Sequence, residues 1–189
     1  MDFQSYLAEF EHILNNTNPP VPYDNPEYLN YTKLNWARLN RWLRKGELNE
    51  QLIAVLAAIS VPQHWIVITE PWCGDAAHSV PFLQMAAQSN PLISVEYELR
   101  DSPPFRITNY LTNGSKSIPK LIIQDGQGND LATWGPRPAA CQQLYDQLKA
   151  EGADFETQKV ALQSWYNADK GQSLQLELGD LIGKASAGH

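Results

Sequence analysis

Hydrophobic positions in the first sixty residues repeat at helical spacing and predict three helices. The first has apolar residues at intervals of three and four positions and stops at the Asn- and Pro-rich residues 15–20: Phe3, Tyr6, Leu7, Phe10, Ile13 and Leu14. Asn25 and Pro26 are typical of a cap and a first helical residue, and Gly46 ends this second helix. The third helix runs from about residue 48 to residue 59.

The next ninety residues alternate between strand-like and helix-like patterns. Continuous or alternating apolar runs predict strands over residues 65–68, 93–99, 120–123 and 131–134, the last two joined as a hairpin. Helical patterns lie over residues 75–88, around 104–111 and over 138–150. This order predicts an α/β fold with a mixed, largely parallel sheet flanked by helices, in which the hairpin adds an antiparallel strand.

The length of 189 residues favours a single domain over residues 1–189. We place its core at about 61–151, with an N-terminal helical extension over 1–60 and a C-terminal helical extension over 152–189. Residues 155–170 indicate a helix, whereas the leucines at 174, 176, 178 and 181 fit a helix or a strand.

Charge and composition narrow the function classes. A formal net charge of −7 argues against a nucleic-acid partner, which needs a cationic surface. The longest apolar stretch, residues 52–61, is too short to span a membrane, and no leader pattern opens the chain. Two distant cysteines provide no disulfide framework and favour the cytoplasm. The four histidines have no paired spacing, so neither a metal nor a cofactor is expected.

The turn after the first strand carries the residue with the clearest chemistry. Cys73 sits where the strand ends and a helix begins, and free N–H groups at a helix N-terminus favour a thiolate. Nearby Glu70 and Asp75 oppose thiolate formation by their charge. The direction of the pKa shift therefore stays open, and a small buried cysteine is the alternative interpretation.

Three further residues have competing interpretations. His78 lies about one helical turn beyond Cys73 and is either a base for that thiol or a solvent-facing side chain. Arg137 lies in a Gly-Pro-Arg-Pro turn and either contacts an anionic ligand or serves only the turn. Cys141 falls on the apolar face of the helix over 138–150, where we expect a core residue.

Three features together resemble the thioredoxin superfamily over about residues 61–151. They are Trp72-Cys73-Gly74-Asp75, Pro81 eight residues beyond the cysteine, and Ser117-Ile118-Pro119 just before a strand. The first motif resembles that of a bacterial thioredoxin-like branch whose members have a single cysteine at this site.

The resemblance implies a thioredoxin-like fold and a cis Ile118–Pro119 bond in a loop that faces Cys73. On this basis Cys73 is the candidate catalytic residue. Trp72, Ile118 and Pro119 are the candidate substrate-binding residues, and Asp75 and His78 are candidate modulators.

Departures from the family leave two functions open. Ala76 stands where the family has its second cysteine and cannot resolve a mixed disulfide, and Val67 stands where the family has a buried acid. One hypothesis is a monothiol disulfide oxidoreductase that uses Cys73, with a disulfide substrate and an external thiol reductant as partners. The alternative is a thioredoxin-fold module that binds a protein or peptide without turnover. The oligomeric state stays open.

Overall fold

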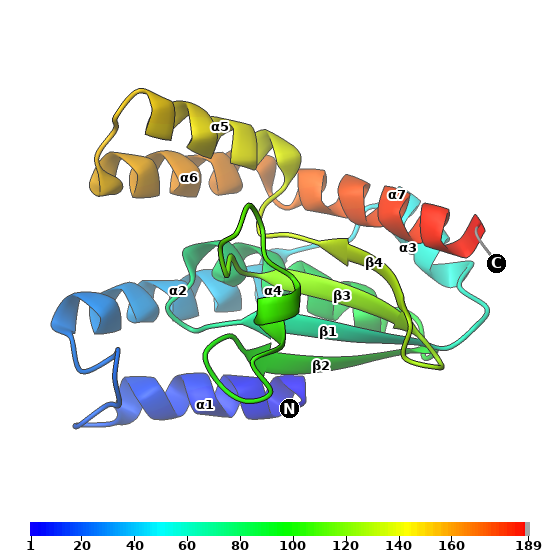
Figure 1. Ribbon diagram of the computed structural model, residues 1–189, viewed down its shortest axis with the longest axis horizontal. Coiled ribbons are helices and arrows are strands. Elements are labelled where there is room, and N and C mark those ends of the chain that lie inside the picture. The colour runs from blue at the N-terminus through cyan, green and yellow to red at the C-terminus, as the bar shows by residue number, and fades with distance from the viewer. Residues whose placement is uncertain (188–189) are drawn as a thin grey trace.

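The computed structural model describes residues 1–187 and contains a four-stranded sheet flanked by helices (Figure 1). Residues 188 and 189, which the expected domain includes, lie outside the described residues. The elements in chain order are α1 (Phe3–Asn15), α2 (Pro26–Lys45), α3 (Glu50–Ala57), β1 (Gln63–Thr69), α4 (Gly74–Gln88), β2 (Ile93–Leu99), the 3₁₀ helix η1 (Arg106–Asn109), β3 (Lys120–Asp125), β4 (Asp130–Trp134), α5 (Ala139–Ala150), α6 (Phe155–Asp169) and α7 (Gln172–Ala187).

The sheet has the strand order β2-β1-β3-β4. β1 runs parallel to β2 and antiparallel to β3, and β3 runs antiparallel to β4. The mixed α/β fold is therefore confirmed, but the expectation of a largely parallel sheet is wrong. Parallel strands need a long crossover connection, usually a helix. The segment between β2 and β3 contains only the short helix η1, and β3 runs antiparallel to β1.

The helix expected around residues 104–111 is also wrong in extent, because only one 3₁₀ turn forms there. Phe105, which precedes that turn, has a left-handed backbone with φ of 55°, a conformation that does not continue a right-handed helix. The turn still contributes to the core, since Ile107 is fully buried.

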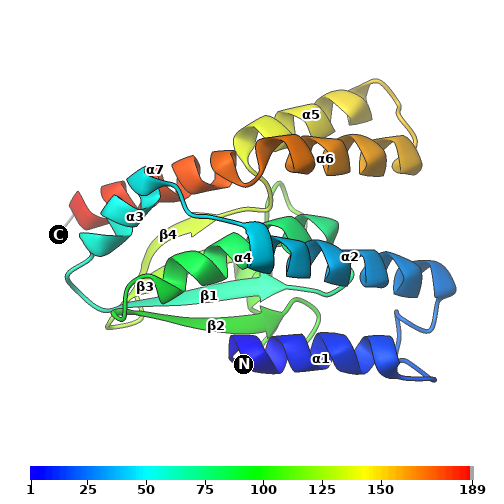
Figure 2. The same ribbon diagram turned by 180° about the vertical axis from the view of Figure 1, so that it is seen from behind.

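Central strand β1 is buried on both faces, as its continuous apolar run predicts. Trp65, Ile66, Val67 and Ile68 are at most 1% exposed. Figure 2 shows α4 lying along the sheet, with α2 packed over α4. At the sheet edge, the N–H of Tyr97 in β2 donates to the carbonyl of Met1, 2.7 Å away.

The helices of the N-terminal and C-terminal extensions follow the predicted pattern closely. The side chain of Asn25 caps α2, Pro26 is its first residue and Gly46 is its C-cap. The C-terminal leucines lie on helix α7, which packs against α3 and β4, so the helical alternative is correct.

Cys141 is fully buried on α5, as expected of a core residue. Within residues 1–187, no helix is both long enough and apolar enough to cross a membrane.

Candidate functional site

Cys73 lies between the N-terminus of α4 and the loop before β3. Its Sγ accepts the N–H of Ala76 at 3.4 Å, so this side chain caps the helix. Its S–H donates to the carbonyl oxygen of Ile118, also at 3.4 Å. The Ile118–Pro119 bond is cis, as the family resemblance implies. Two backbone groups thus hold the cysteine, one three residues away from it in the sequence and the other 45 residues away.

The Cys73 thiol is protonated at neutral pH. Cys73 is 6% exposed. Its burial is the main reason why the pKa of the thiol is raised to about 12, and the negative charge of Asp75 is the second. The N–H of Ala76 and the charge of Arg137 act in the opposite direction and are outweighed. The structure therefore resolves the direction that the sequence leaves open, because desolvation outweighs the favourable helix N-terminus.

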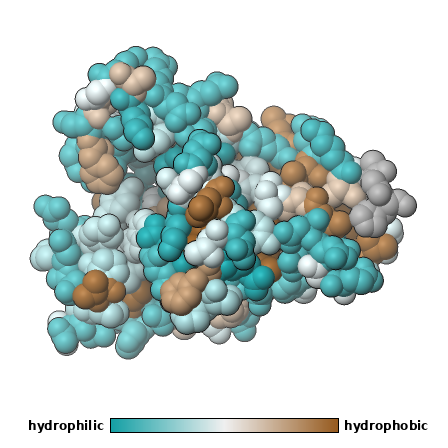
Figure 3. Space-filling view, in the orientation of Figure 1, coloured by the Kyte–Doolittle hydropathy of each residue, from teal (hydrophilic) through white to brown (hydrophobic). Residues whose placement is uncertain are grey.

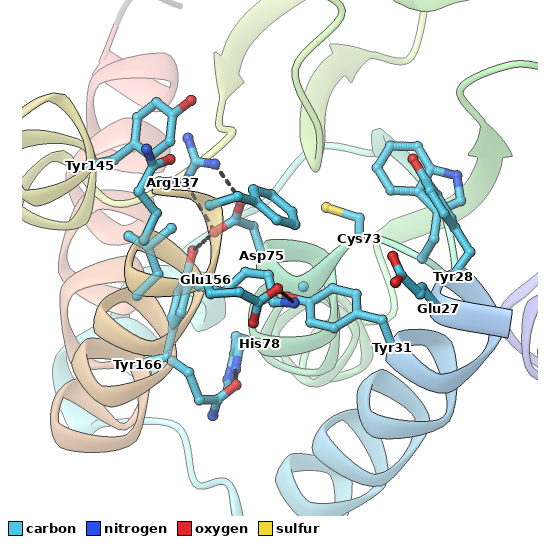
Figure 4. Close-up of a pocket in the computed structure, with 17 residues that line it drawn as sticks. Glu27, Tyr28, Tyr31, Cys73, Asp75, His78, Arg137, Tyr145, Glu156 and Tyr166 are labelled. Carbon is cyan, nitrogen blue, oxygen red and sulfur yellow. Dashed lines mark hydrogen bonds and ion pairs between the residues drawn. The ribbon is translucent and has the colours of Figure 1, made fainter. Parts of the chain in front are cut away.

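Asp75 and Arg137 form a buried ion pair beside the thiol (Figure 4). The guanidinium reaches the carboxylate with Nη2 at 2.7 Å and Nε at 3.0 Å, and the hydroxyl of Tyr166 donates to Oδ1 at 2.8 Å. Both charged side chains are less than one fifth exposed. Arg137, for which the sequence left open a contact with an anionic ligand, therefore pairs with a carboxylate of the protein itself.

His78 is a buried structural residue. It is 3% exposed, so the solvent-facing interpretation is wrong. Nδ1 accepts the indole N–H of Trp42 at 2.9 Å, which leaves Nε2 as the protonated nitrogen, 3.0 Å from Gln163 Oε1. Burial lowers the pKa of His78 to about 4. Both ring nitrogens are therefore engaged away from Cys73.

Two hollows meet at Cys73. The larger, which we call the α2–α6 cleft, has a volume of about 500 Å³ and separates α2 from α6. It is the hollow between the upper and lower helical parts in Figure 3, and Figure 4 shows its interior. Its lining is rich in aromatic residues from four segments: Tyr28, Tyr31, Trp72, Tyr145, Phe155 and Tyr166.

The smaller hollow, which we call the loop groove, has a volume of about 290 Å³ and lies against the loop before β3. Its lining includes Trp72, Arg100 and residues 115–118, together with Asp75, Pro136 and Arg137. The guanidinium of Arg100 lies 4.6 Å from the Trp72 ring centre. Cys73 lines both hollows.

The structure brings most of the expected site residues together. Trp72, Cys73, Asp75 and Ile118 all line the loop groove. Pro119 is buried, and among the described residues 1–187 it is not one of those that line either hollow. The contribution of α2 and α6 was not predicted from the sequence, although Tyr28 and Tyr31 stand three positions apart and therefore share a face of one helix.

A buried lysine and a glycine shape the loops around the groove. Lys120 donates from Nζ to the Thr112 hydroxyl at 2.8 Å and to the Gly135 carbonyl at 3.1 Å. Gly135 has φ of 112° and lies against the Pro119 carbonyl. Among residues 1–187, no cluster of three or more histidine, cysteine or acidic side chains is arranged to hold a metal ion.

Comparisons with known proteins concern the family and the fold. By sequence, residues 22–149 match the family described as thioredoxin. Among solved structures, a protein of unknown function from Pseudomonas aeruginosa is similar, with 21% identity, a TM-score of 0.57 and coverage of 84% of this chain and 86% of that one. An HIV epitope scaffold is similar at 19% identity, with the same TM-score and coverage of 84% and 90%. No curated protein matches by sequence.

Proposed function

Because this chain belongs to the thioredoxin family, we propose that it binds a peptide segment of a partner in the loop groove without chemical turnover. One observation carries the proposal, namely that the Cys73 S–H donates to the Ile118 carbonyl while burial raises the pKa of this thiol to about 12. The thiolate is the nucleophile in disulfide exchange, and it is scarce at neutral pH at such a pKa. The groove is accessible, but its thiol is in the unreactive form.

The surrounding residues support binding over dithiol chemistry. Ala76 occupies the position of the second family cysteine, and Cys141 is fully buried on α5. The loop groove combines an aromatic wall at Trp72 with the hydroxyls of Ser115 and Ser117 and the cationic side chains of Arg100 and Lys116. An aromatic face beside side chains that can form hydrogen bonds provides both kinds of contact that peptide recognition uses.

Monothiol exchange is the second candidate, and the position of Cys73 favours it. Sγ lies at the N-terminus of α4 and lines both hollows, so a disulfide entering either one meets it. After losing its proton to solvent, the Cys73 thiolate would attack one sulfur of the disulfide and release the other as a thiolate. An external thiolate would then attack the mixed disulfide, carry the substrate sulfur away as a new disulfide and regenerate Cys73.

The pH dependence of Cys73 alkylation separates the two candidates. Iodoacetamide labelling is followed by mass spectrometry, with Cys73→Ser as the blank. Under the binding proposal, labelling at neutral pH is slower than that of a cysteine in an unfolded peptide, and the rate keeps rising above pH about 8.5. An apparent pKa below that of the peptide cysteine would overturn the binding proposal in favour of exchange.

A retention experiment tests binding directly. Random decapeptides are passed over the immobilised protein, and the retained peptides are quantified by mass spectrometry. Binding predicts that Cys73→Ser retains them equally well, that Trp72→Ala loses them, and that Leu34→Ala, a substitution of an exposed residue on α2, has no effect. Retention that requires the thiol and is reversed by a reductant would instead show mixed disulfides.

A further inference from the structure

Lys159 of α6 reaches across the α2–α6 cleft and places its ammonium group between two aromatic rings. Nζ lies 5.0 Å from the ring centre of Tyr31 on α2 and 5.1 Å from that of Phe155 on α6. The same ammonium lies 2.7 Å from a carboxylate oxygen of Glu156. Two rings and a carboxylate thus surround a cation supplied by the protein itself, an arrangement that recognises ammonium groups.

Two components of this arrangement, the Phe155 ring and the Glu156 carboxylate, are open to solvent. Phe155 is 71% exposed, and the Glu156 side chain is 73% exposed, whereas the Lys159 side chain is 27% exposed. A ring and a carboxylate that face water remain available to an incoming group when the lysine leaves. The lysine stem is flexible, so its ammonium can move into solvent without unfolding α6.

The opposite wall of the cleft adds a second carboxylate. Glu27 of α2 lines the cleft beside Tyr28, and among residues 1–187 no ion pair or side-chain hydrogen bond engages its carboxylate. Arg137 also lines the cleft, but Asp75 holds it and its guanidinium lies 4.3 Å from the Tyr145 ring centre. The groups available to a ligand are therefore aromatic faces and carboxylates, which attract cations.

We propose that the α2–α6 cleft is a subsite for a basic side chain of the bound peptide, and that Lys159 occupies this subsite when the peptide is absent. The inference rests on the proposed peptide-binding function and names the side-chain chemistry that the partner presents. Tyr31, Phe155 and Glu156 contact the ligand ammonium group, and Glu27 adds negative charge from the other wall of the cleft. Lys159 acts as an internal competitor, which lowers the apparent affinity for any external cation.

Three five-carbon probes test the charge preference without involving the thiol. n-Pentylammonium, pentan-1-ol and pentanoate are titrated into protein with isotope-labelled tyrosine and phenylalanine rings, and the ring signals of Tyr31 and Phe155 are followed by NMR. Pentylammonium is expected to bind at least about fivefold more tightly than pentan-1-ol, and pentanoate most weakly. Both Glu27→Gln and Phe155→Leu weaken pentylammonium binding.

Lys159→Met provides the decisive variant, because removing an internal competitor strengthens binding of an external cation. The affinity for pentylammonium is expected to rise by about threefold or more. Lys149→Met is the matched control, since Lys149 is exposed on α5 and is not part of the cleft lining. If Lys159 had only a structural role, its replacement would leave pentylammonium binding unchanged or weaken it.

Several outcomes overturn the subsite. They are equal binding of pentan-1-ol and pentylammonium, a preference for pentanoate, or an affinity for pentylammonium that Lys159→Met does not raise. Decapeptides with a fixed central lysine or norleucine distinguish this failure from failure of the proposed function. Equal retention of both pools on the immobilised protein refutes the subsite and leaves peptide binding intact, whereas loss of both pools refutes peptide binding itself.

Discussion

The Asp75 carboxylate and the Arg137 guanidinium meet through two contacts, at 2.7 and 3.0 Å, although they lie 62 residues apart in the sequence. The pair joins the first turn of α4 to the turn that follows β4. It keeps a carboxylate beside Cys73 in a buried environment, where charges interact more strongly than in water. The pair also contributes to keeping the thiol protonated, since Asp75 raises the pKa of Cys73 more than Arg137 lowers it.

Replacing Asp75 by asparagine is expected to lower the pKa of Cys73. The substitution removes the negative charge that opposes the thiolate and leaves the positive charge of Arg137 in place, so the charge that remains favours ionisation. The pKa should fall from about 12 by roughly one to two pH units. Thiolate absorbance in the ultraviolet measures it in a Cys141→Ser background. Asp24→Asn, an exposed control, should leave the pKa unchanged, and an unchanged value in Asp75→Asn would contradict this account.

Glu70 makes stability depend on pH. It is 6% exposed, Oε1 accepts the N–H of Asp101 at 3.1 Å, and burial raises the pKa of its carboxyl from 4.5 to about 7. Because the folded protein binds this proton more tightly than the unfolded chain does, the stabilisation is complete below pH 4.5 and is lost as the pH rises through about 7.

Glu70→Gln should therefore match the original protein in free energy of unfolding near pH 4 and exceed it by about 3 kcal/mol near pH 8. Urea unfolding at the two pH values measures the difference. Glu11→Gln on the exposed side of α1 serves as the control and should show no such pH-dependent gain. If Glu70→Gln gave the same difference at both pH values, the carboxyl would not titrate in this range.

Helix positions could be predicted well because local chemistry fixes them. Asn25, Pro26 and Gly46 mark the ends of α2 through capping rules that operate within a few residues. Strand direction could not be predicted as well, because it depends on how the chain returns from β2 to β3. The left-handed Phe105 backbone shortens the expected helix in that connection, and sequence periodicity does not report this feature.

Part of the candidate site could also be predicted. The position of Cys73 follows from the strand-to-helix transition, and its contact with the Ile118 loop follows from the family resemblance. The hydrogen bond that Tyr166 donates to Asp75 and the one between His78 and Gln163 involve α6, which lies outside the residues of the resemblance. Long-range packing between α4 and a C-terminal helix has no local pattern in the sequence.

Gly135→Ala should destabilise the protein and disturb the loop groove. A Cβ atom at this position would overlap the Pro119 carbonyl oxygen, and φ of 112° is strained for any residue with a side chain. The expected loss is at least about 2 kcal/mol in free energy of unfolding, measured by urea denaturation. Gly126→Ala is the control, because nothing lies within 4 Å of its Cβ position. Equal stabilities for the two variants would refute the close approach.

Gly74 and Tyr31, which lie against each other in the wall of the α2–α6 cleft, should be energetically coupled. A Cβ atom on Gly74 would overlap the Tyr31 hydroxyl oxygen, whereas the ring carbons Cζ and Cε1 would lie at 3.3 and 3.6 Å, a tight and an ordinary contact. Gly74→Ala should therefore cost about 1–2 kcal/mol in the original protein, despite the better helix propensity of alanine. In Tyr31→Phe the overlapping oxygen is absent, so the same alanine should cost about 1 kcal/mol less.

A double-mutant cycle of urea unfolding measures this coupling. The two single variants, the double variant and the original protein are compared, and the interaction free energy is obtained from their difference. A second cycle with Gly126→Ala and Tyr31→Phe should be additive, because nothing lies within 4 Å of the Cβ position at Gly126. Additivity in the first cycle would mean that Tyr31 moves aside without cost. It would then fail to define the wall of the cleft against which a ligand is held.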